Sequence, residues 1–185
     1  MRNNERKQHW KQHAGVLILL ALFAAEILFV TRGGHLYGYD YDWNAQHVEF
    51  PNYMRNLFYS TGKLFPDFAA NLGGGQNIYY IAYYGLFSPV VLLSYLLPFI
   101  PMLSYMTGAA IILTCASILL AWRWFHIHFS NRIAFFASLM FTLAMPVMYH
   151  SHHHLMFVNY LPFMILAMEG DRKSTRLNSS HGRRS

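Results

Sequence analysis

Long apolar stretches alternate with short polar ones along the whole chain. The apolar stretches lie at about 14–31, 102–125, 132–149 and 155–168. A helix needs about 20 residues to cross a bilayer, and most of these stretches come close to that length or exceed it. We therefore predict four membrane-spanning helices in an all-α, polytopic integral membrane protein.

The polar segment 1–13 precedes the first apolar stretch and carries four basic residues. A secretory signal peptide is the alternative interpretation, but the apolar core is long and no small-residue cleavage site precedes Arg32. Because cytoplasmic segments of membrane proteins are enriched in Lys and Arg, we predict a cytoplasmic N-terminus.

Segment 32–101 is then predicted to lie outside the membrane as a long loop. Within it, residues at the i, i+3, i+4, i+7, i+8 spacing of an amphipathic helix are Phe50, Tyr53, Met54, Leu57 and Phe58. We expect this helix to stop at Thr61 and Gly62, and to rest its apolar face on lipid or on the bundle. We also expect Pro51 to interrupt any helix that runs through it, which divides the region in two.

Segment 77–101 allows two interpretations. It is apolar but contains three prolines, so it either crosses the membrane or re-enters and lies along the outer face. A crossing would place Arg123 and Arg132 outside, whereas a re-entrant segment leaves both inside. The positive-inside rule favours the re-entrant arrangement, and broken helices at membrane depth are tolerated where protein buries them.

Composition agrees with a membrane protein. Of the 185 residues, 55% are hydrophobic and only 12% are charged, whereas soluble domains carry about 25% charged residues. The lone Cys115 has no partner for a disulfide and leaves the redox compartment open.

The formal net charge of +6 belongs largely to a polar C-terminal tail. Asp171–His181 reads DRKSTRLNSSH, which is also the translation of a common sequencing-library adapter. We therefore treat residues 171–185 as an artefact rather than as a genuine basic tail at the membrane. Without them, nine Lys and Arg stand against seven Asp and Glu. This near balance argues against nucleic acid as a partner, and we expect the natural protein to continue beyond Gly170.

Two carboxylates, Asp40 and Asp42, lie just beyond the first apolar stretch. Asp42 and Gln46 are four residues apart and would share one face of a helix. A carboxylate among aromatic residues at a membrane surface can act as a general base, because partial desolvation raises its pKa. The alternative is that both are ordinary solvated loop acids.

Three consecutive glycines, Gly73 to Gly75, do not form a nucleotide-phosphate loop, because no Lys-Ser or Lys-Thr pair follows them. They favour a tight turn or a close approach of the backbone to a substrate, where Gln76 and Asn77 would hydrogen-bond sugar hydroxyls. A merely flexible turn is the alternative.

Glu26 lies inside the first predicted span, where a charge is costly, and we expect it to have a structural partner within the bundle. After the third span, an HSHHH motif places four histidines outside: His150, His152, His153 and His154. Adjacent side chains diverge and no Cys supports them, so we predict no dedicated metal site. A weak divalent-metal site shared with the loop carboxylates, and a pH-sensitive cap that contacts phosphate, stay open as alternatives.

Three motifs resemble the N-terminal region of the YfhO family of bacterial membrane proteins. They are DWNAQH at Asp42–His47, FPNYMRNLFYSTG at Phe50–Gly62, and NLGGGQNIYYIAYYGLFSPVVLLSYLLP at Asn71–Pro98. The resemblance covers essentially all of residues 14–170. YfhO proteins resemble the large membrane glycosyltransferases of the GT-C class, which implies a GT-C-like N-terminal helical bundle. Family members have further spans and an extracellular C-terminal part that this chain lacks.

The resemblance implies transfer of a sugar from an undecaprenyl-phosphate-linked donor to an envelope acceptor such as lipoteichoic acid, at the bacterial cell membrane. In that class an Asp in the first outside loop is the usual base, a role that carries over to Asp42 and, second, to Asp40. The substrate-binding candidates are Gln46, His47, Gln76, Asn77 and Tyr80. No cofactor is implied, and the chain by itself is expected to be inactive. A transporter or flippase of lipid-linked sugars and a non-enzymatic membrane subunit are the alternatives.

Overall fold

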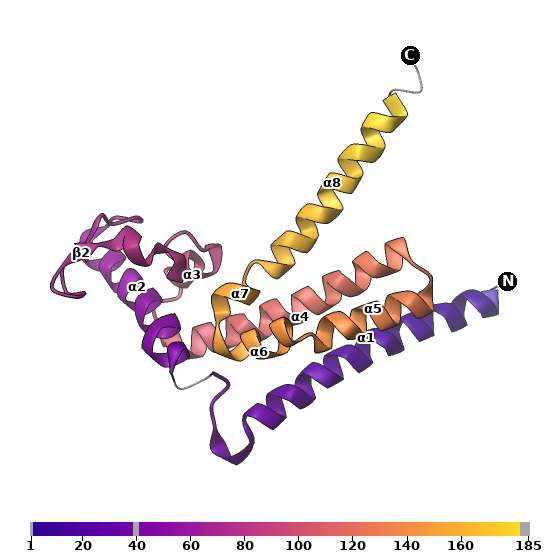
Figure 1. The fold of residues 1–185 in the computed structure, drawn as a ribbon, viewed down its shortest axis with the longest axis horizontal. Helices are drawn as coiled ribbons and strands as arrows, with labels where there is room; N and C mark the ends of the chain where they lie inside the picture. Colours follow the sequence, from indigo (N-terminus) through magenta and orange to yellow (C-terminus); the bar gives the residue numbers. More distant parts are fainter. Residues whose placement is uncertain (1, 39–40, 182–185) are drawn as a thin grey trace.

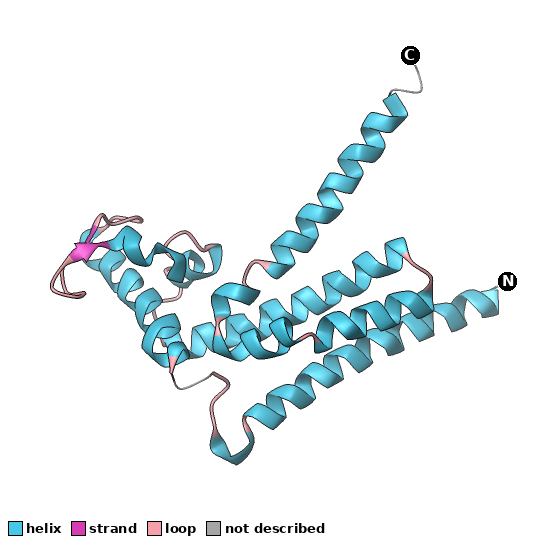
Figure 2. Cartoon of the chain, viewed as in Figure 1, coloured by secondary structure: helices cyan, strands magenta, loops and turns pink. Residues whose placement is uncertain are grey.

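The computed structural model describes residues 2–38 and 41–181. With η marking 3₁₀- or π-helical segments, the elements are α1 Arg2–Val30, η1 Arg32–Gly34, η2 Trp43–Val48, α2 Glu49–Thr61, β1 Phe68–Ala69, β2 Gln76–Asn77, η3 Ile78–Tyr84, α3 Pro89–Ser94, α4 Met102–His128, α5 Asn131–Leu143, α6 Met145–His153, α7 Leu155–Val158 and α8 Leu161–His181. The described chain is mostly helical, as predicted (Figure 2). Its two strands pair antiparallel and have two residues each.

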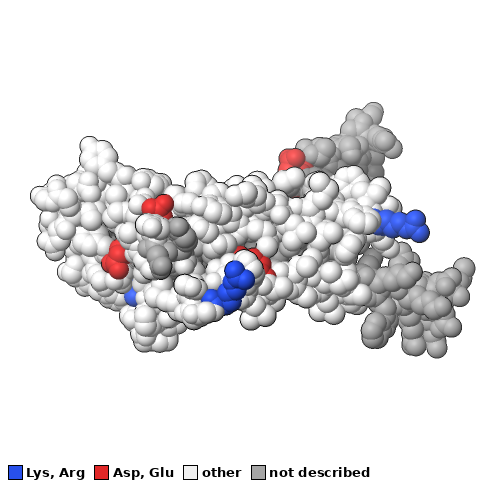
Figure 3. Space-filling model, turned by 60° about the horizontal axis from the view of Figure 1, so that its bottom comes forward, with Lys and Arg blue, Asp and Glu red and all other residues white. Residues whose placement is uncertain are grey.

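Three helical stretches of the described chain are long and apolar enough to cross a membrane: His13–Val30, Met102–His128 and Asn131–His153. They correspond to the first three predicted spans. Only 17% to 28% of each apolar window is buried inside the protein, so most of its residues are free to face lipid. Charged atoms are sparse over the bundle in the space-filling view (Figure 3), as the low charge content predicts.

These stretches pack together as a helical bundle in which α4 contacts both α1 and α5 (Figure 1). Leu19 and Phe23 of α1 are buried against Ile118 of α4. Gly15 allows a close approach of the two helices, because a Cβ there would clash with the indole ring of Trp122. Small residues permit such approaches between membrane helices.

The start of α1 and the turn between α4 and α5 lie at the same end of the bundle, and residues 43–101 gather at the other end (Figure 1). We term residues 43–101 the outer unit. This relative arrangement agrees with a topology in which 1–13 and the turn at 129–130 share one side of the membrane. Which side is cytoplasmic stays a prediction.

The outer unit begins with an uninterrupted helical stretch, since η2 leads directly into α2. The expectation that Pro51 interrupts a helix is therefore wrong. η2 is a π-helix, in which a carbonyl bonds the N–H five residues on rather than four. This change of register makes room for a proline, which has no N–H to offer and crowds the carbonyl four residues before it. α2 ends at Gly62 with φ 71°, as predicted.

The apolar face of α2 packs on protein rather than on lipid. Met54 is fully buried, and the other four residues of the predicted face pack against the same core. Arg55 is 6% exposed, and its guanidinium donates to the carbonyl oxygens of Ile100 at 3.0 Å and Leu97 at 3.5 Å. A further bond runs to Asn52 Oδ1 at 3.3 Å. Arg55 therefore fastens α2 to the turn that leads into α4.

Segment 77–101 folds into η3, α3 and turns, and its longest helix has seven residues. No helix in this described segment has the roughly 20 residues that a bilayer crossing needs. The segment packs instead on α2 and α4. This folding agrees with the re-entrant or surface arrangement that the distribution of basic residues favours, and the position of the segment relative to the membrane stays a prediction.

The fourth predicted span, 155–168, is divided between α7 and α8. α8 packs against α4, and Leu161, Ile165 and Glu169, which lie four positions apart, are buried. Glu169 Oε2 lies 3.2 Å from Arg123 Nη2 of α4. Because the break leaves a shorter apolar helix, a membrane crossing by this segment stays a prediction.

Cysteine labelling tests this topology. In a Cys115→Ser background, a membrane-impermeant maleimide added to intact cells should label Asn71→Cys, whereas Ser130→Cys should react only after the membrane is opened. Both positions are exposed, so the membrane alone decides their reactivity. Labelling of Ser130→Cys alone in intact cells would mean that the chain is inverted. Labelling of both positions in intact cells would mean that segment 77–101 crosses.

Candidate functional site

Asp42 is held by side chains from two distant parts of the chain. Gln46 Nε2 donates to Asp42 Oδ1 at 3.0 Å, as their four-residue spacing predicts. On its other side, His154 Nε2 lies 3.3 Å from Asp42 Oδ2. The Asp42 side chain remains 49% exposed. The carboxylate is therefore oriented but still open to an incoming group.

A break between α6 and α7 places His154. Its backbone leaves the helical region, with φ −138° and ψ 83°. His150 Nδ1 lies 3.0 Å from His154 Nδ1, so one of these nitrogens donates to the other. When His154 donates from Nε2 to Asp42, its Nδ1 accepts from His150 in the neutral ring. Both His154 nitrogens are then occupied, whereas the oxygens of Asp42 keep free lone pairs, so Asp42 is better placed to take a proton.

Tyr84 fixes the amide of Gln46. Its hydroxyl donates to Gln46 Oε1, which leaves the NH₂ group of Gln46 to donate to Asp42. Burial raises the pKa of Tyr84, as do its neighbours Tyr83 and Asp42, so the hydroxyl stays protonated and can donate. A chain of hydrogen bonds thus runs from η3 through η2 to the carboxylate.

His47 lies beneath this cluster and is 2% exposed. Its ring centroid is 5.5 Å from that of Tyr84 and 5.6 Å from that of His154. Burial lowers the pKa of His47 to about 4, with a contribution from His154 that Asp42 partly opposes. The ring is therefore neutral at physiological pH. Its Nε2 is buried and has no hydrogen-bond partner within the described part of the chain.

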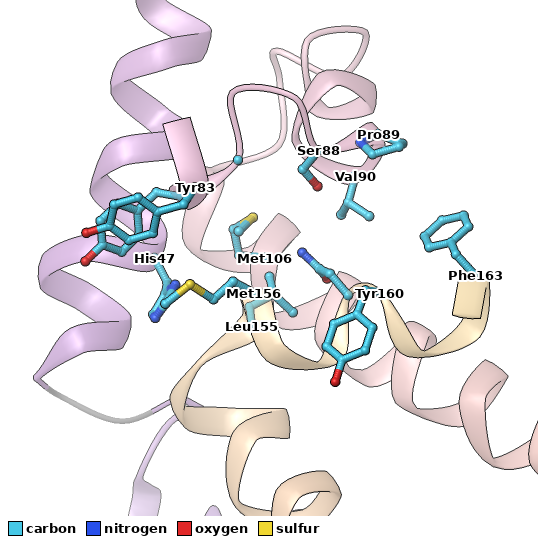
Figure 4. A pocket seen from close by; sticks show the side chains of 13 residues that line it. His47, Tyr83, Ser88, Pro89, Val90, Met106, Leu155, Met156, Tyr160 and Phe163 are labelled. Atoms are coloured by element: carbon cyan, nitrogen blue, oxygen red, sulfur yellow. The ribbon is translucent and has the colours of Figure 1, made fainter. Parts of the chain in front are cut away.

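His47 and Tyr84 also line a cavity of about 330 Å³ between η3, α3 and the α7–α8 region (Figure 4). Aromatic and apolar side chains form most of its wall. The other lining residues are Tyr83, Gly85, Ser88, Pro89, Val90, Met106, Leu155, Met156, Asn159, Tyr160 and Phe163. The cavity wall thus includes Tyr84, which is hydrogen-bonded to Gln46, and His47, whose ring lies close to those of Tyr84 and His154.

A second polar cluster surrounds Glu26, which is 9% exposed. His152 Nδ1 lies 3.0 Å from Glu26 Oε1, at ion-pair distance. The hydroxyl of Tyr37 lies 3.5 Å from Glu26 Oε2 and donates to Ser151 Oγ at 2.8 Å. Glu26 therefore has partners within the bundle, as expected of an acid in a membrane helix.

The remaining predicted site residues lie elsewhere or outside the described residues. Asp40 belongs to the undescribed pair 39–40. Gln76 forms β2 with Asn77, whose side chain caps η3 by accepting a backbone N–H. Tyr80 is 75% exposed. β2 lies beyond the C-terminal end of α2 (Figure 1), whereas Asp42 precedes η2 at the N-terminal end of that helix. The fold thus gathers Asp42, Gln46 and His47, and the substrate roles of the other residues stay predictions.

Sequence reasoning placed the histidine motif on the same side as Asp42 but did not pair His154 with it. It also did not identify Tyr84 or Asn159. In the sequence, Tyr84 is one of several neighbouring tyrosines, and nothing in the pattern singles it out. Among the described residues, no group of three His, Cys, Asp or Glu side chains is arranged to hold a metal ion.

The chain matches no family model, and no curated protein or solved structure shows detectable similarity to it. The resemblance to the YfhO family therefore stays a hypothesis based on the three sequence motifs.

Proposed function

We propose that this chain forms part of a membrane glycosyltransferase that uses an undecaprenyl-phosphate-linked sugar, with Asp42 as the base. The observation that supports this function best is an oriented, half-exposed carboxylate at the end of an apolar bundle, beside an aromatic cavity. A lipid-linked donor would keep its carrier in the bilayer and present its sugar at this level. The proposed acceptor is a hydroxyl of an envelope glycopolymer such as lipoteichoic acid.

In the proposed reaction, Asp42 removes the proton of the acceptor hydroxyl as its oxygen attacks the anomeric carbon of the sugar. The new bond joins that oxygen to the anomeric carbon, while the bond from this carbon to the phosphate oxygen breaks. Undecaprenyl phosphate leaves with the electron pair. Gln46 and His154 orient the carboxylate through its two oxygens, which is the positioning that proton transfer requires.

The second candidate function is transport of a lipid-linked sugar across the membrane. The observation that favours it is the buried contact between Glu26 and His152, since ionisable residues inside membrane segments often line translocation paths. In this alternative the Asp42 cluster would bind the sugar without reacting with it.

One assay separates the two functions. The complete protein, reconstituted in vesicles, receives a fluorescent undecaprenyl-phosphate sugar and lipoteichoic acid as acceptor. We expect label to appear on the acceptor at a rate that requires protein. The acceptor-free sample measures movement of the donor between leaflets as a control. Protein-dependent movement of the donor without any labelled acceptor would overturn the proposal in favour of transport.

A further inference from the structure

Two side chains that line the cavity beside Asp42 each carry a buried polar atom without a partner among the described residues. Nε2 of His47 and Oδ1 of Asn159 are both buried, and neither has a hydrogen-bond partner among the described residues. Both side chains line the cavity. A buried polar group without a partner costs about 1–3 kcal/mol, so each of these two atoms calls for a partner that the described residues do not supply.

The wall of the cavity determines which ligand chemistry fits. None of its lining residues is Lys, Arg, Asp or Glu, so the wall supplies no charge to pair with an anion. The Asn159 oxygen can only accept a hydrogen bond and therefore needs a donor. A phosphate diester or a carboxylate would leave it unpaired, because their oxygens only accept. A hydroxyl group can donate to Asn159 and can either donate to or accept from the neutral ring of His47.

The remaining features favour a ring that carries several hydroxyls. Tyr83 and Tyr160 are exposed residues that line the cavity on different sides (Figure 4), and each ring offers a flat apolar face with a polar tip. The volume of about 330 Å³ lies at the lower end of the roughly 300–1,000 Å³ typical of small-molecule sites. This size suits one ring better than an oligosaccharide.

We infer that the cavity binds a single uncharged sugar ring, with its hydroxyls on His47 and Asn159 and its carbon face on one of the two tyrosines. The inference deepens the proposed function, on which it rests for its place beside the reacting carboxylate. Tyr84 connects the two, because it lines the cavity and is hydrogen-bonded to the Gln46 that orients Asp42. The charged phosphate of a donor then lies outside this cavity.

Binding of simple glycosides to the full 185-residue chain tests the inference. The chain is reconstituted in phosphatidylcholine nanodiscs, and saturation-transfer NMR detects methyl glucopyranoside, methyl galactopyranoside and methyl N-acetylglucosaminide. We expect at least one glycoside to bind, and inorganic phosphate not to displace it. Asn159→Leu keeps the size of the side chain but removes both polar atoms, and should weaken binding at least tenfold. Asn44→Leu is the matched control, because Asn44 is exposed on the adjacent η2.

A second variant keeps the test decisive if Asn159→Leu folds poorly. Val90→Trp places a large ring in the cavity and should abolish binding while the helical circular dichroism of the protein stays unchanged. Displacement of the glycoside by phosphate, absence of binding by all three glycosides, or wild-type binding by both cavity variants would each overturn the inference.

Asp42→Asn should retain glycoside binding. If that variant also transferred sugar normally in the complete protein, the proposed base would be wrong while the sugar cavity stood.

Discussion

Replacing Asp42 with Asn should slow sugar transfer by the complete protein about 10²–10⁴-fold, the range that general-base catalysis contributes. Asn has the shape of Asp and still accepts one hydrogen bond, but its amide cannot take the acceptor proton. The side chain is half-exposed, so expression and membrane insertion should stay normal. Initial rates of transfer from a radiolabelled undecaprenyl-phosphate sugar measure the effect.

Asp67→Asn is the matched control, since Asp67 is exposed in the same outer unit and pairs with Lys63 at the surface. Gln46→Ala should reduce the rate about tenfold, roughly the value of one lost orienting hydrogen bond to a charged group. Asp40→Asn should have a smaller effect than Asp42→Asn. Near-normal transfer by Asp42→Asn would show that the base lies elsewhere. Full activity in both single variants and in the double variant would remove the enzyme interpretation of this loop.

Replacing Arg55 with Met should destabilise the packing of α2 on the turn before α4 without unfolding the membrane bundle. Met preserves the apolar stem but loses the bonds to Leu97, Ile100 and Asn52. Hydrogen bonds of charged groups contribute about 1.5–3 kcal/mol, and the released carbonyls lose their donor. We expect a local destabilisation of about 3 kcal/mol, which corresponds to roughly 100-fold faster exchange, since about 1.4 kcal/mol is a factor of ten.

Hydrogen exchange followed by mass spectrometry reports this opening in α2 and in the turn before α4. Lys63→Met is the control, because its ion pair with Asp67 is exposed and such pairs contribute about 0–1 kcal/mol. Exchange in α4 itself should change little. Unchanged protection of α2 in Arg55→Met would show that the carbonyl contacts do not hold the outer unit in place.

The membrane helices could be predicted because bilayer thickness imposes their length on the sequence. The end of α2 could be predicted because a glycine reaches the left-handed conformation with φ 71° at little cost. Both signals are local. The contact between Asp42 and Gln46 was also accessible, since it follows from a separation of four residues.

The rest of the candidate site depends on contacts between distant parts of the chain. Asp42 and His154 are 112 positions apart, and they meet only because α6 ends one residue before His154 and the chain turns there. Asn159 reaches the cavity through the same change of direction. The expected break at Pro51 does not occur, because the proline rule assumes an α-helix, whereas the preceding η2 is a π-helix.

The π-helical register of η2 also determines how the site responds to a change in chain length. A π-turn holds one more residue than the α-turn that it replaces. Deleting one residue from Trp43–Val48 would therefore restore an α-helical turn, and the residues before it would keep their rotation relative to α2. Inserting one residue has the opposite effect, because the turn is already widened. The residues before it would then rotate by about 100° relative to α2, and Asp42 would turn away from Tyr84 and the cavity. In this segment, the reacting group should tolerate a one-residue deletion much better than a one-residue insertion.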